Sequence, residues 1–553
     1  MRGVERKRNI PISIQGKTLK RVIYLKIILL TIGLSMDIHS GGELSKNQMA
    51  IDINHYDIRL KVDTKRKMIS GYVDIKIKIV DNLRFIELDL INQYFVSKVL
   101  IDSVSTPFKH KQNKIYVKAK NIKIGDLVNI RVVYKGKPPE AKKPPWSGGF
   151  TWEKSKDGYP WVGISCQGNG AHIWFPCKEH PSDEPDSVDI YITVQKPLSI
   201  ASNGLLQGVV DHKNKWHTWH WKTRYNINPY NINLTIGNFE VVKRISPVLE
   251  KPLNVEFYVL KNNVNGAEGL LDQTEDFLEF FTRNFGQYPW IKEKLGLVNT
   301  PYWGMEHQTM IAYGNDYKNN KKGYDFLLFH EMAHEWWGNY LSVADWADLW
   351  IHEGFAVYAE ALYLEEKYGA DEYNKFFRTR ILKKIPRNQP VVPQRNASME
   401  LVSGLDPYNK GAYVLHMLRY LIGDEIFFEI LNEFPHIKKE LPNNQVSSND
   451  FVEFVHKKYG KNIDWFFKVY LFEKEYPVLI QKTKHGSNHT FIEFRWKNKN
   501  FEMPVDVFYN SNTGLRQRRL SLTNKPTMIA IPQYNKIKID PEKRVLLTTY
   551  EEK

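Results

Sequence analysis

The segment from Phe326 to Asn339 constrains the fold more than any other part of the chain. It reads Phe-Leu-Leu-Phe-His-Glu-Met-Ala-His-Glu-Trp-Trp-Gly-Asn. His330 and His334 are four positions apart, so on a helix they share one face, where two imidazoles can bind one metal ion. Two packing histidines on an amphipathic helix are the alternative. The pattern predicts a helix that carries part of a metal site.

A third ligand is expected from a second helical segment, residues 349–360. Glu353 follows His334 with eighteen residues between them, enough for one helix to end and another to return. Two imidazoles and a carboxylate suit a catalytic zinc that keeps one position for water. Zinc lowers the pKa of its bound water to about 7, and Glu331 is placed to take the proton. Glu360 either orients a ligand histidine or faces solvent.

The period of the apolar residues divides the rest of the chain into three domains. Short alternating runs from about residue 51 predict an antiparallel β domain over 46–242. From about residue 265 the period is helical, so we assign 243–474 to a mainly helical catalytic domain with a small sheet. Alternation returns after Tyr476 and predicts a small β-sandwich over 475–553. The fold class is multidomain α+β.

The N-terminal segment resembles a targeting sequence. Residues 1–26 carry a net charge of +7, from eight basic side chains and one acidic, and the apolar run from Ile27 to Met36 has ten residues. That length suits a signal-peptide core better than a membrane span. We assign 1–45 to a signal peptide or anchor with a linker, cleaved between Ser35 and Gly42. An uncleaved membrane anchor or a buried first helix are the alternatives. We expect export to the periplasm, the envelope or the medium, with the cytoplasm as the alternative.

Composition excludes several classes of protein. Hydrophobic residues make up 42% of the chain and charged residues 25%, which are globular values. Two cysteines, Cys166 and Cys177, exclude a disulfide framework and a thiolate-only metal cluster. We expect them to be free buried thiols, although a disulfide after export is open. The net charge is +16, but no nucleic-acid-binding signature accompanies it, so no nucleic-acid partner is expected.

These motifs resemble those of the zinc aminopeptidase family of gluzincins that includes aminopeptidase N and leukotriene hydrolase. The resemblance runs from about residue 50 to the end. Its sharpest parts are the two-histidine helix with Trp336 to Asn339, the returning Glu353, and the segment Gly304 to His307. It implies a saddle-like N-terminal β domain, a thermolysin-like catalytic domain, a small C-terminal β-sandwich and one Zn2+ per chain. The chain looks like a bacterial-type member without a C-terminal helical domain.

The resemblance also implies roles for individual residues. Glu306 would bind the free α-amine of a peptide, and the backbone of Gly304 and Met305 would pair with the peptide chain. Gln167 would help to hold the amine end, with an ordinary loop amide as the alternative. Tyr408, in the segment from Pro407 to Gly411, would donate a hydrogen bond to the developing oxyanion. The implied function is a zinc-dependent aminopeptidase in peptide catabolism, with Glu331 as general base.

Three residues depart from the family pattern. Trp303 stands where a small residue is usual and could reshape the cleft, and His307 and His352 replace asparagines. Because the chain stops at Lys553, after the expected β-sandwich, we expect a more open cleft or a dimer that covers it. Two other functions stay open: a hydrolase of a non-peptide, epoxide-type substrate on the same site, and a catalytically idle envelope-binding protein. Membrane association through the N-terminal segment is compatible with each of them.

Overall fold

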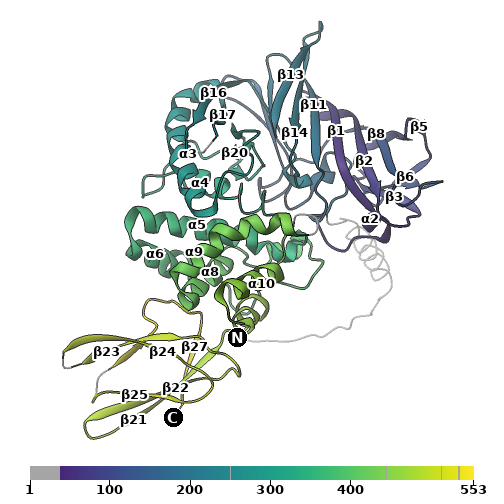
Figure 1. Ribbon diagram of the computed structural model, residues 1–553. Helices are drawn as coiled ribbons and strands as arrows, with labels where there is room; N and C mark the ends of the chain where they lie inside the picture. The colour runs from purple at the N-terminus through teal and green to yellow at the C-terminus, as the bar shows by residue number, and fades with distance from the viewer. Residues whose placement is uncertain (1–37, 249–250, 442–444, 512, 534–535, 553) are drawn as a thin grey trace, which may run out of the picture. The chain divides into compact units, whose positions relative to one another are not determined.

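The structure is a computed structural model that describes residues 38–248, 251–441, 445–511, 513–533 and 536–552. From His39 onward the chain forms one unit. Along that unit a β-rich part is followed by helices and then by further strands (Figure 1). The expected signal peptide or anchor falls almost wholly on residues outside this description. Among the described helices, none combines the length and the apolar character that a membrane crossing requires.

The first domain is built on an eight-stranded sheet with the order β13-β14-β11-β1-β2-β8-β4-β5. Strand β1 pairs in parallel with β11 and antiparallel with β2. A bulge between Ile53 and His55 shifts the alternation, so that Tyr56, Ile58 and Leu60 are buried. The strands are β1 (Ile51–Asp63), β2 (Met68–Ile79), β4 (Phe95–Ile101), β5 (Val104–Ser105), β8 (Leu127–Gly136), β11 (Ser187–Gln195), β13 (Leu205–Asp211) and β14 (Trp216–Thr223).

Two smaller sheets complete the β domain. One has the order β3-β7-β6 and the other β12-β15-β10-β9. Strand β10 ends at Ser165, two residues before Gln167, so the second sheet leads directly into the predicted site. Their strands are β3 (Phe85–Asp89), β6 (Phe108–Lys111), β7 (Lys114–Lys118), β9 (Gly149–Lys154), β10 (Pro160–Ser165), β12 (Ser199–Ser202) and β15 (Leu234–Gly237), and the short helices are α2 (Lys46–Met49), η1 (Ala171–Ile173) and η2 (Pro229–Asn231).

A five-stranded sheet with the order β16-β17-β18-β20-β19 follows the β domain along the chain. Helix α3 connects β17 to the parallel strand β18 and ends at Phe285, and Gly286 follows with φ +87°. The edge strand β19 pairs antiparallel with β20, Gly304 opposite Tyr313. The elements are β16 (Phe239–Ser246), β17 (Leu253–Leu260), η3 (Lys261–Asn263), α3 (Val264–Phe285), β18 (Leu295–Asn299), β19 (Gly304–Met305) and β20 (Ile311–Tyr313).

Helices make up most of the described chain from Phe326 to Phe472. Helix α5 contacts α4 and α8, and α9 contacts α3, α8 and α10 (Figure 1). The helices are α4 (Phe326–Ala333), η4 (Trp346–Asp348), α5 (Trp350–Tyr368), α6 (Ala370–Phe376), η5 (Phe377–Ile381), α7 (Met399–Ser403), α8 (Asn409–Ile422), α9 (Asp424–Glu433), η6 (Phe434–Glu440), α10 (Ser448–Tyr459), α11 (Asp464–Phe467) and η8 (Lys468–Phe472).

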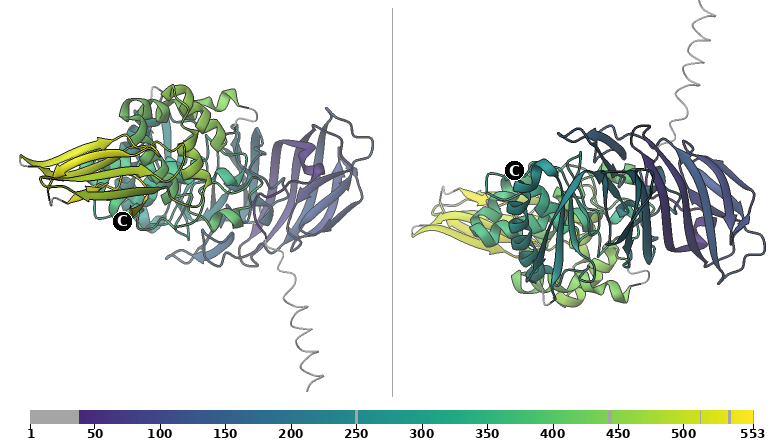
Figure 2. Two further views of the ribbon diagram at one scale, coloured as in Figure 1. Left: turned by 90° about the horizontal axis from the view of Figure 1, so that it is seen from below. Right: turned by 90° about the horizontal axis from the view of Figure 1, so that it is seen from above.

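The C-terminal part consists of strands joined by loops (Figure 2). They form two sheets, β25-β22-β21-β27 and β24-β23-β26. Trp496 and Val507, one from each sheet, are both fully buried. The predicted α+β fold class is confirmed. The strands are β21 (Val478–His485), β22 (His489–Trp496), β23 (Val505–Ser511), β24 (Gly514–Leu520), β25 (Thr527–Pro532), β26 (Ile537–Ile539) and β27 (Thr548–Glu552).

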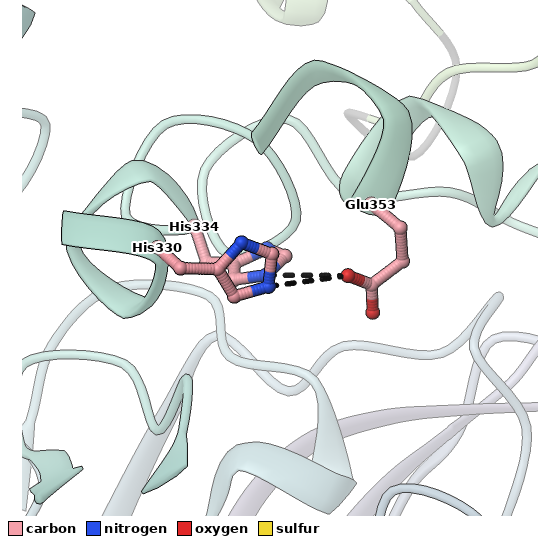
Figure 3. A group of neighbouring side chains, drawn as sticks. All are labelled: His330, His334 and Glu353. Carbon is pink, nitrogen blue, oxygen red and sulfur yellow. Dashed lines mark hydrogen bonds and ion pairs between the residues drawn. The ribbon is translucent and has the colours of Figure 1, made fainter. Parts of the chain in front are cut away.

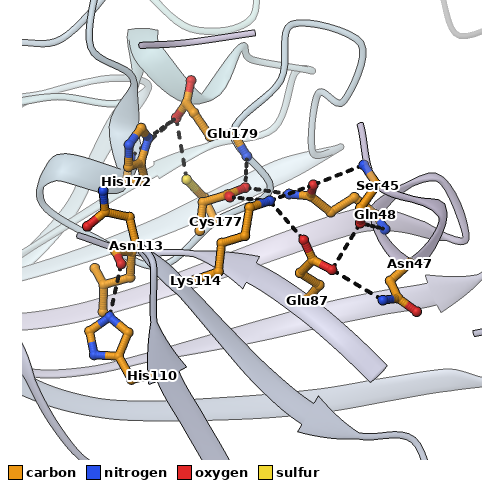
Figure 4. Close-up of polar contacts among 12 residues, drawn as sticks. Ser45, Asn47, Gln48, Glu87, His110, Asn113, Lys114, His172, Cys177 and Glu179 are labelled. Carbon is orange, nitrogen blue, oxygen red and sulfur yellow. Dashed lines mark hydrogen bonds and ion pairs between the residues drawn. The ribbon is translucent and has the colours of Figure 1, made fainter. Parts of the chain in front are cut away.

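Both cysteines are free and buried, as expected. The thiol of Cys166 donates a hydrogen bond to the carbonyl of Tyr230 (3.2 Å), and that of Cys177 donates to Glu179 (3.5 Å). Figure 4 shows Cys177 and His172 both beside Glu179, where they contact the same carboxylate oxygen. Burial raises the pKa of both thiols, so neither is an activated nucleophile.

Candidate metal centre and cleft

Helix α4 carries His330 and is capped at its C-terminus by His334, and its start and its buried face are both fixed. The side chain of Asp325 caps it by accepting a hydrogen bond from the backbone N–H of Leu328 (3.1 Å). Phe329 packs against Phe281 of α3, with ring centroids 4.8 Å apart. Because Phe329 is packed on this side, the opposite face of α4, which carries His330, is turned toward the cleft.

Helix α5 brings Glu353 back to α4. After α4 the chain turns at Gly338, whose φ of +130° is rarely adopted by residues with a side chain. A Cβ at this position would also approach the rings of two histidines to 3.2 and 3.3 Å. The side chain of Asp345 then accepts a hydrogen bond from Ala347 (2.9 Å) and starts η4, which leads into α5.

The three predicted ligands converge on one point (Figure 3). The Nε2 atoms of His330 and His334 lie 3.3 Å apart. Oε2 of Glu353 is 3.6 Å from Nε2 of His330 and 3.5 Å from Nε2 of His334. A carboxylate oxygen and two imidazole nitrogens can therefore bind a single ion from three sides.

The hydrogen bonds around this group fit a metal ion. Nδ1 of His334 lies 2.9 Å from the carbonyl oxygen of Trp337. Donation of the Nδ1 proton to that oxygen leaves a lone pair on Nε2, which faces the other ligands. Oε2 of Glu353 is buried and has no hydrogen-bond partner among the described residues. An unpaired carboxylate oxygen beside two imidazole nitrogens is a donor set for zinc.

The charges of the group also favour a cation. Burial alone would lower the pKa of His334, but Glu353 raises it to about 10. Burial would raise the pKa of Glu353, but the two histidines lower it far below its usual range. Glu353 is therefore ionised, and its negative charge beside the two imidazoles attracts a cation. Binding of a metal ion would release any proton that the ligand side chains hold.

Glu331 and Gly304 are in direct contact across the cleft. A Cβ on Gly304 would meet Oε1 of Glu331 and Cδ1 of Leu327, each at 2.6 Å. Glycine is therefore needed for β19 to approach α4 this closely. Burial, and then the charge of Glu306, raise the pKa of Glu331 well above its usual value. A carboxylate with raised proton affinity is suited to accept a proton.

Glu306 is buried directly after β19, and side chains from the β domain hold it. Gln167 donates from Nε2 to Oε1 of Glu306 (2.5 Å), and the hydroxyl of Tyr230 donates to the same oxygen (3.0 Å). Asn339 donates to the backbone carbonyl of Glu306 (2.9 Å). Burial raises the pKa of Glu306, so a cationic ligand such as an ammonium group would stabilise its charged form.

Sequence reasoning missed the roles of Tyr230 and Asn339. Nothing in the sequence around Tyr230 distinguishes it from the other 29 tyrosines. The sequence did offer a signal for Asn339, because it is the last residue of the motif Trp336 to Asn339 that follows the second histidine. Its amide bridges Glu306 and Asn231, the latter at 2.8 Å.

Tyr408 lies at the mouth of the cleft, immediately before α8. Tyr408 is 39% exposed. The centroid of its ring lies 6.5 Å from that of His330, and the two rings are nearly parallel, at 22°. Desolvation of the hydroxyl end, and then the charge of Glu353, raise the pKa of Tyr408 well above its usual value. The phenol therefore stays protonated and can donate a hydrogen bond.

The two histidines that replace asparagines are both buried and neutral. Burial lowers the pKa of His307 to about 3, and neither of its ring nitrogens has a hydrogen-bond partner among the described residues. Burial also lowers the pKa of His352 to about 3, and its Nε2 accepts a hydrogen bond from the backbone of Val343 (3.2 Å). Neither adds a charge to the site.

Glu360 is buried, so a solvent-facing role is wrong. It accepts hydrogen bonds from the hydroxyl of Tyr324 (2.9 Å) and from Arg380 (2.5 Å). Neither partner is a metal-ligand candidate. Glu360 instead fixes the helical turn that carries Arg380 against α5.

A cleft of about 280 Å³ joins these groups. It is lined by all three ligand candidates, by Glu331 and Tyr408, and by Gln167, Gly304, Met305 and Glu306. The structure thus places every predicted site residue in one cleft. The remaining lining residues are Pro145, Trp146, Trp303, Phe326, Leu327, Val357, Arg380, Ile381, Lys384 and Asn409.

Most of the chain matches the models of two known protein domains. Residues 53–230 match the peptidase M1 N-terminal domain, and residues 270–470 match the peptidase family M1 domain. The chain is 23% identical over 487 residues to the probable aminopeptidase 2 of Sulfurisphaera tokodaii, covering 83% of this chain and 59% of that protein. The chain spans less than two thirds of the length of such curated relatives, for example 29% of human endoplasmic reticulum aminopeptidase 1.

Solved structures with the same fold cover most of the chain. The M1 zinc metallopeptidase of Deinococcus radiodurans superposes with a TM-score of 0.66 at 23% identity, covering 77% of this chain and 95% of that one. Aminopeptidase A of Legionella pneumophila, in complex with aspartic acid, gives a TM-score of 0.75 at 15% identity, covering 91% of this chain and 60% of that one.

Proposed function

The chain belongs to peptidase family M1, and from this premise we propose that it is a zinc-dependent aminopeptidase. It hydrolyses the first peptide bond of peptides with a free N-terminus. The observation that carries the proposal is the position of Glu306: a buried carboxylate, held by Gln167 and Tyr230, lines the same cleft as His330, His334 and Glu353. A carboxylate fixed beside the reaction centre binds an ammonium group and sets its distance from the scissile carbonyl.

Residues of this chain can bind the metal, transfer the proton and stabilise the developing charge. Bound by His330, His334 and Glu353, zinc would act as a Lewis acid toward water and the scissile carbonyl. Glu331 takes a proton from the attacking water and passes it to the leaving amine, for which its raised pKa suits it. The protonated phenol of Tyr408 donates a hydrogen bond to the oxygen that gains charge during attack.

The edge strand β19 positions the peptide. Because β19 is the last strand of its sheet, its free edge can pair with the extended backbone of a substrate. Gly304 and Met305 supply that edge, next to Glu306 on one side and Glu331 across the cleft. The substrate amine and the scissile bond are thereby brought to their respective carboxylates.

A panel of amino-acid p-nitroanilides tests the proposal, each with a free amine and in an N-acetylated form. The full chain should cleave only the free-amine forms, lose this activity with a zinc chelator and regain it with zinc. Equal cleavage of acetylated forms would overturn the role of Glu306. No cleavage of either form, with zinc bound, would favour a non-peptide substrate or an idle site.

We also propose that the protein acts outside the cytoplasm, on the basis of the basic and apolar residues at its N-terminus. Fractionation of cells that express the full chain tests this proposal. The protein should be found in the periplasm, the medium or the envelope, and recovery in the cytoplasm alone would contradict the proposal.

A further inference from the structure

We propose that Trp146 and Trp303 form the subsite for the second residue of the peptide and favour an aromatic or large apolar side chain there. This inference rests on the proposed aminopeptidase function and adds a substrate preference to it. The two rings lie on the wall of the cleft with centroids 6.0 Å apart and planes at 37°. Trp146 is 73% exposed and Trp303 is 41% exposed. Two large apolar rings so exposed in one cleft have surface that a ligand can cover.

The aromatic wall continues along the cleft. The ring of Trp303 also lies 6.1 Å from that of Phe326, at an angle of 42°. The guanidinium of Arg380 lies over the ring of Phe326, 4.9 Å from its centroid. Because Arg380 is bound to Glu360, it is held in place beside this wall. An aromatic side chain could contact both indole rings at once.

The backbone of Trp146 is fixed although its side chain is exposed. The turn that carries it is closed by hydrogen bonds from Ser147 N–H to the carbonyl of Lys143 (2.9 Å) and from Lys143 N–H to the hydroxyl of Ser147 (2.6 Å). Gly148 then donates its N–H to the side chain of Asn169 (2.6 Å). Asn169 is two residues from Gln167, so this turn is attached to the loop that holds the amine site.

The backbone of Trp303 is equally constrained. Its carbonyl accepts a hydrogen bond from the N–H of Gly314 (2.6 Å). The preceding Tyr302 is buried, and its hydroxyl donates to the carbonyl of Ile164 (2.6 Å). Both indoles are therefore presented by rigid backbone, and binding a ligand requires little ordering.

The direction of the peptide assigns this wall to its second residue. Glu306 binds the amine, and Gly304 lies against Glu331, where the scissile bond must be placed. A peptide that runs from Glu306 past Gly304 reaches Trp303 next, because successive strand residues advance by about 3.3 Å. The side chain that follows the scissile bond thus meets the two tryptophans.

Two tripeptides test the inference, X-Phe-Gly and X-Gly-Gly, where X is the best N-terminal residue of the p-nitroanilide panel. For the full wild-type chain we expect kcat/KM to be about tenfold higher for X-Phe-Gly. In Trp146→Ala and Trp303→Ala this ratio should fall to about two. Phe95→Ala, which removes an exposed aromatic ring outside the cleft-lining set, should keep the wild-type ratio.

A binding measurement separates this inference from the proposed function. In the Glu331→Gln variant, calorimetric titration should show about tenfold tighter binding of X-Phe-Gly than of X-Gly-Gly, and Trp146→Ala in the same background should remove the difference. Equal binding of both peptides overturns the inference even if the enzyme cleaves them. A binding preference without any hydrolysis in wild type supports the subsite and overturns the aminopeptidase activity.

Discussion

Nε2 of Gln167 lies 2.5 Å from Oε1 of Glu306, although 139 positions separate the two residues. The β domain therefore completes a site whose metal ligands all come from the helices that follow. Tyr230, also from the β domain, binds the same oxygen. A carboxylate with two donors on one oxygen keeps its other oxygen for a substrate amine.

We expect Glu306→Gln to lower kcat/KM for free-amine p-nitroanilides by about 100-fold, because the amide keeps the shape but loses the charge that binds an ammonium group. Gln167→Ala should cost about tenfold, since Tyr230 still orients the carboxylate. Steady-state kinetics at constant zinc content measure both effects. Full activity of the Glu306 variant would show that the amine binds elsewhere.

Glu331→Gln should reduce kcat by about 1000-fold, because an amide cannot accept the proton of the attacking water. The side chain is nearly isosteric, so the contact with Gly304 should persist. Zinc content by atomic absorption should remain one ion per chain. A variant that loses its metal as well would assign Glu331 a structural role instead.

The sequence identified the parts of the site that depend on local spacing. The histidines of α4 are fixed by the helical period alone, and the alternation of β1 predicted its buried face. The contacts that cross domains could not be derived this way. Tyr230 meets Glu306 across 76 positions, and such a contact depends on how two sheets pack rather than on any local pattern.

The contacts of Glu360 could not be predicted from local sequence patterns either, although its partners lie closer in the chain. Its helical position was correctly inferred, but its partners Tyr324 and Arg380 come from a loop and from η5. Burial of a helix face against later segments depends on tertiary packing, so a charged residue on α5 could be assigned to solvent from sequence alone. Trp303 was predicted from sequence to reshape the cleft, but nothing in the sequence linked it to Trp146, whose ring the fold brings beside it.

Tyr408→Phe should lower kcat about 100-fold, since the variant loses a hydrogen bond to the developing charge. KM and zinc content should change little. Because the pKa of Tyr408 is raised, the wild-type phenol remains protonated through pH 9.5, and loss of its proton should not limit activity there. The ratio of wild-type to variant kcat should therefore be constant from pH 7 to 9.5, and a ratio that falls within this range would contradict the assignment.

Ser40→Ala should destabilise the protein by about 1–2 kcal/mol, because Ser40 is fully buried and makes two side-chain hydrogen bonds. Its hydroxyl donates to Glu179 (2.8 Å) and accepts from the indole of Trp346 (3.0 Å). His39→Ala is the matched control, because among the described residues the side chain of His39 makes a partly exposed ion pair with Glu400 and no contact comparable to those of Ser40. The unfolding midpoint in urea measures both changes.

The contacts of Ser40 also predict how removal of the N-terminal residues affects stability and substrate binding. The N–H of Ser40 also donates to the carbonyl of Gly168 (3.1 Å), next to Gln167. A chain that begins at residue 46 should therefore have a lower unfolding midpoint and a higher KM than one that begins at residue 38. Equal values for the two chains would show that this segment does not support the amine site.

Lys294 provides a pH-dependent test of the fold away from the cleft. It is fully buried, its ammonium group donates to the carbonyls of Ser202 (3.2 Å) and Gly204, and it lies 4.8 Å from the ring centre of Trp221. Burial lowers its pKa to about 8 from a model-compound value of 10.5. Between these values the unfolded chain binds the proton and the folded chain does not, so stability rises with pH in that interval and is unaffected below pH 8.

Lys294→Met removes this titration. The free energy of unfolding of wild type, minus that of the variant, should rise by about 2 kcal/mol from pH 8 to 9.5. Lys78→Met, which removes an exposed lysine from β2, should show no such rise. Urea unfolding followed by tryptophan fluorescence gives both differences. Parallel pH curves for wild type and Lys294→Met would mean that the buried ammonium group keeps its proton throughout this range.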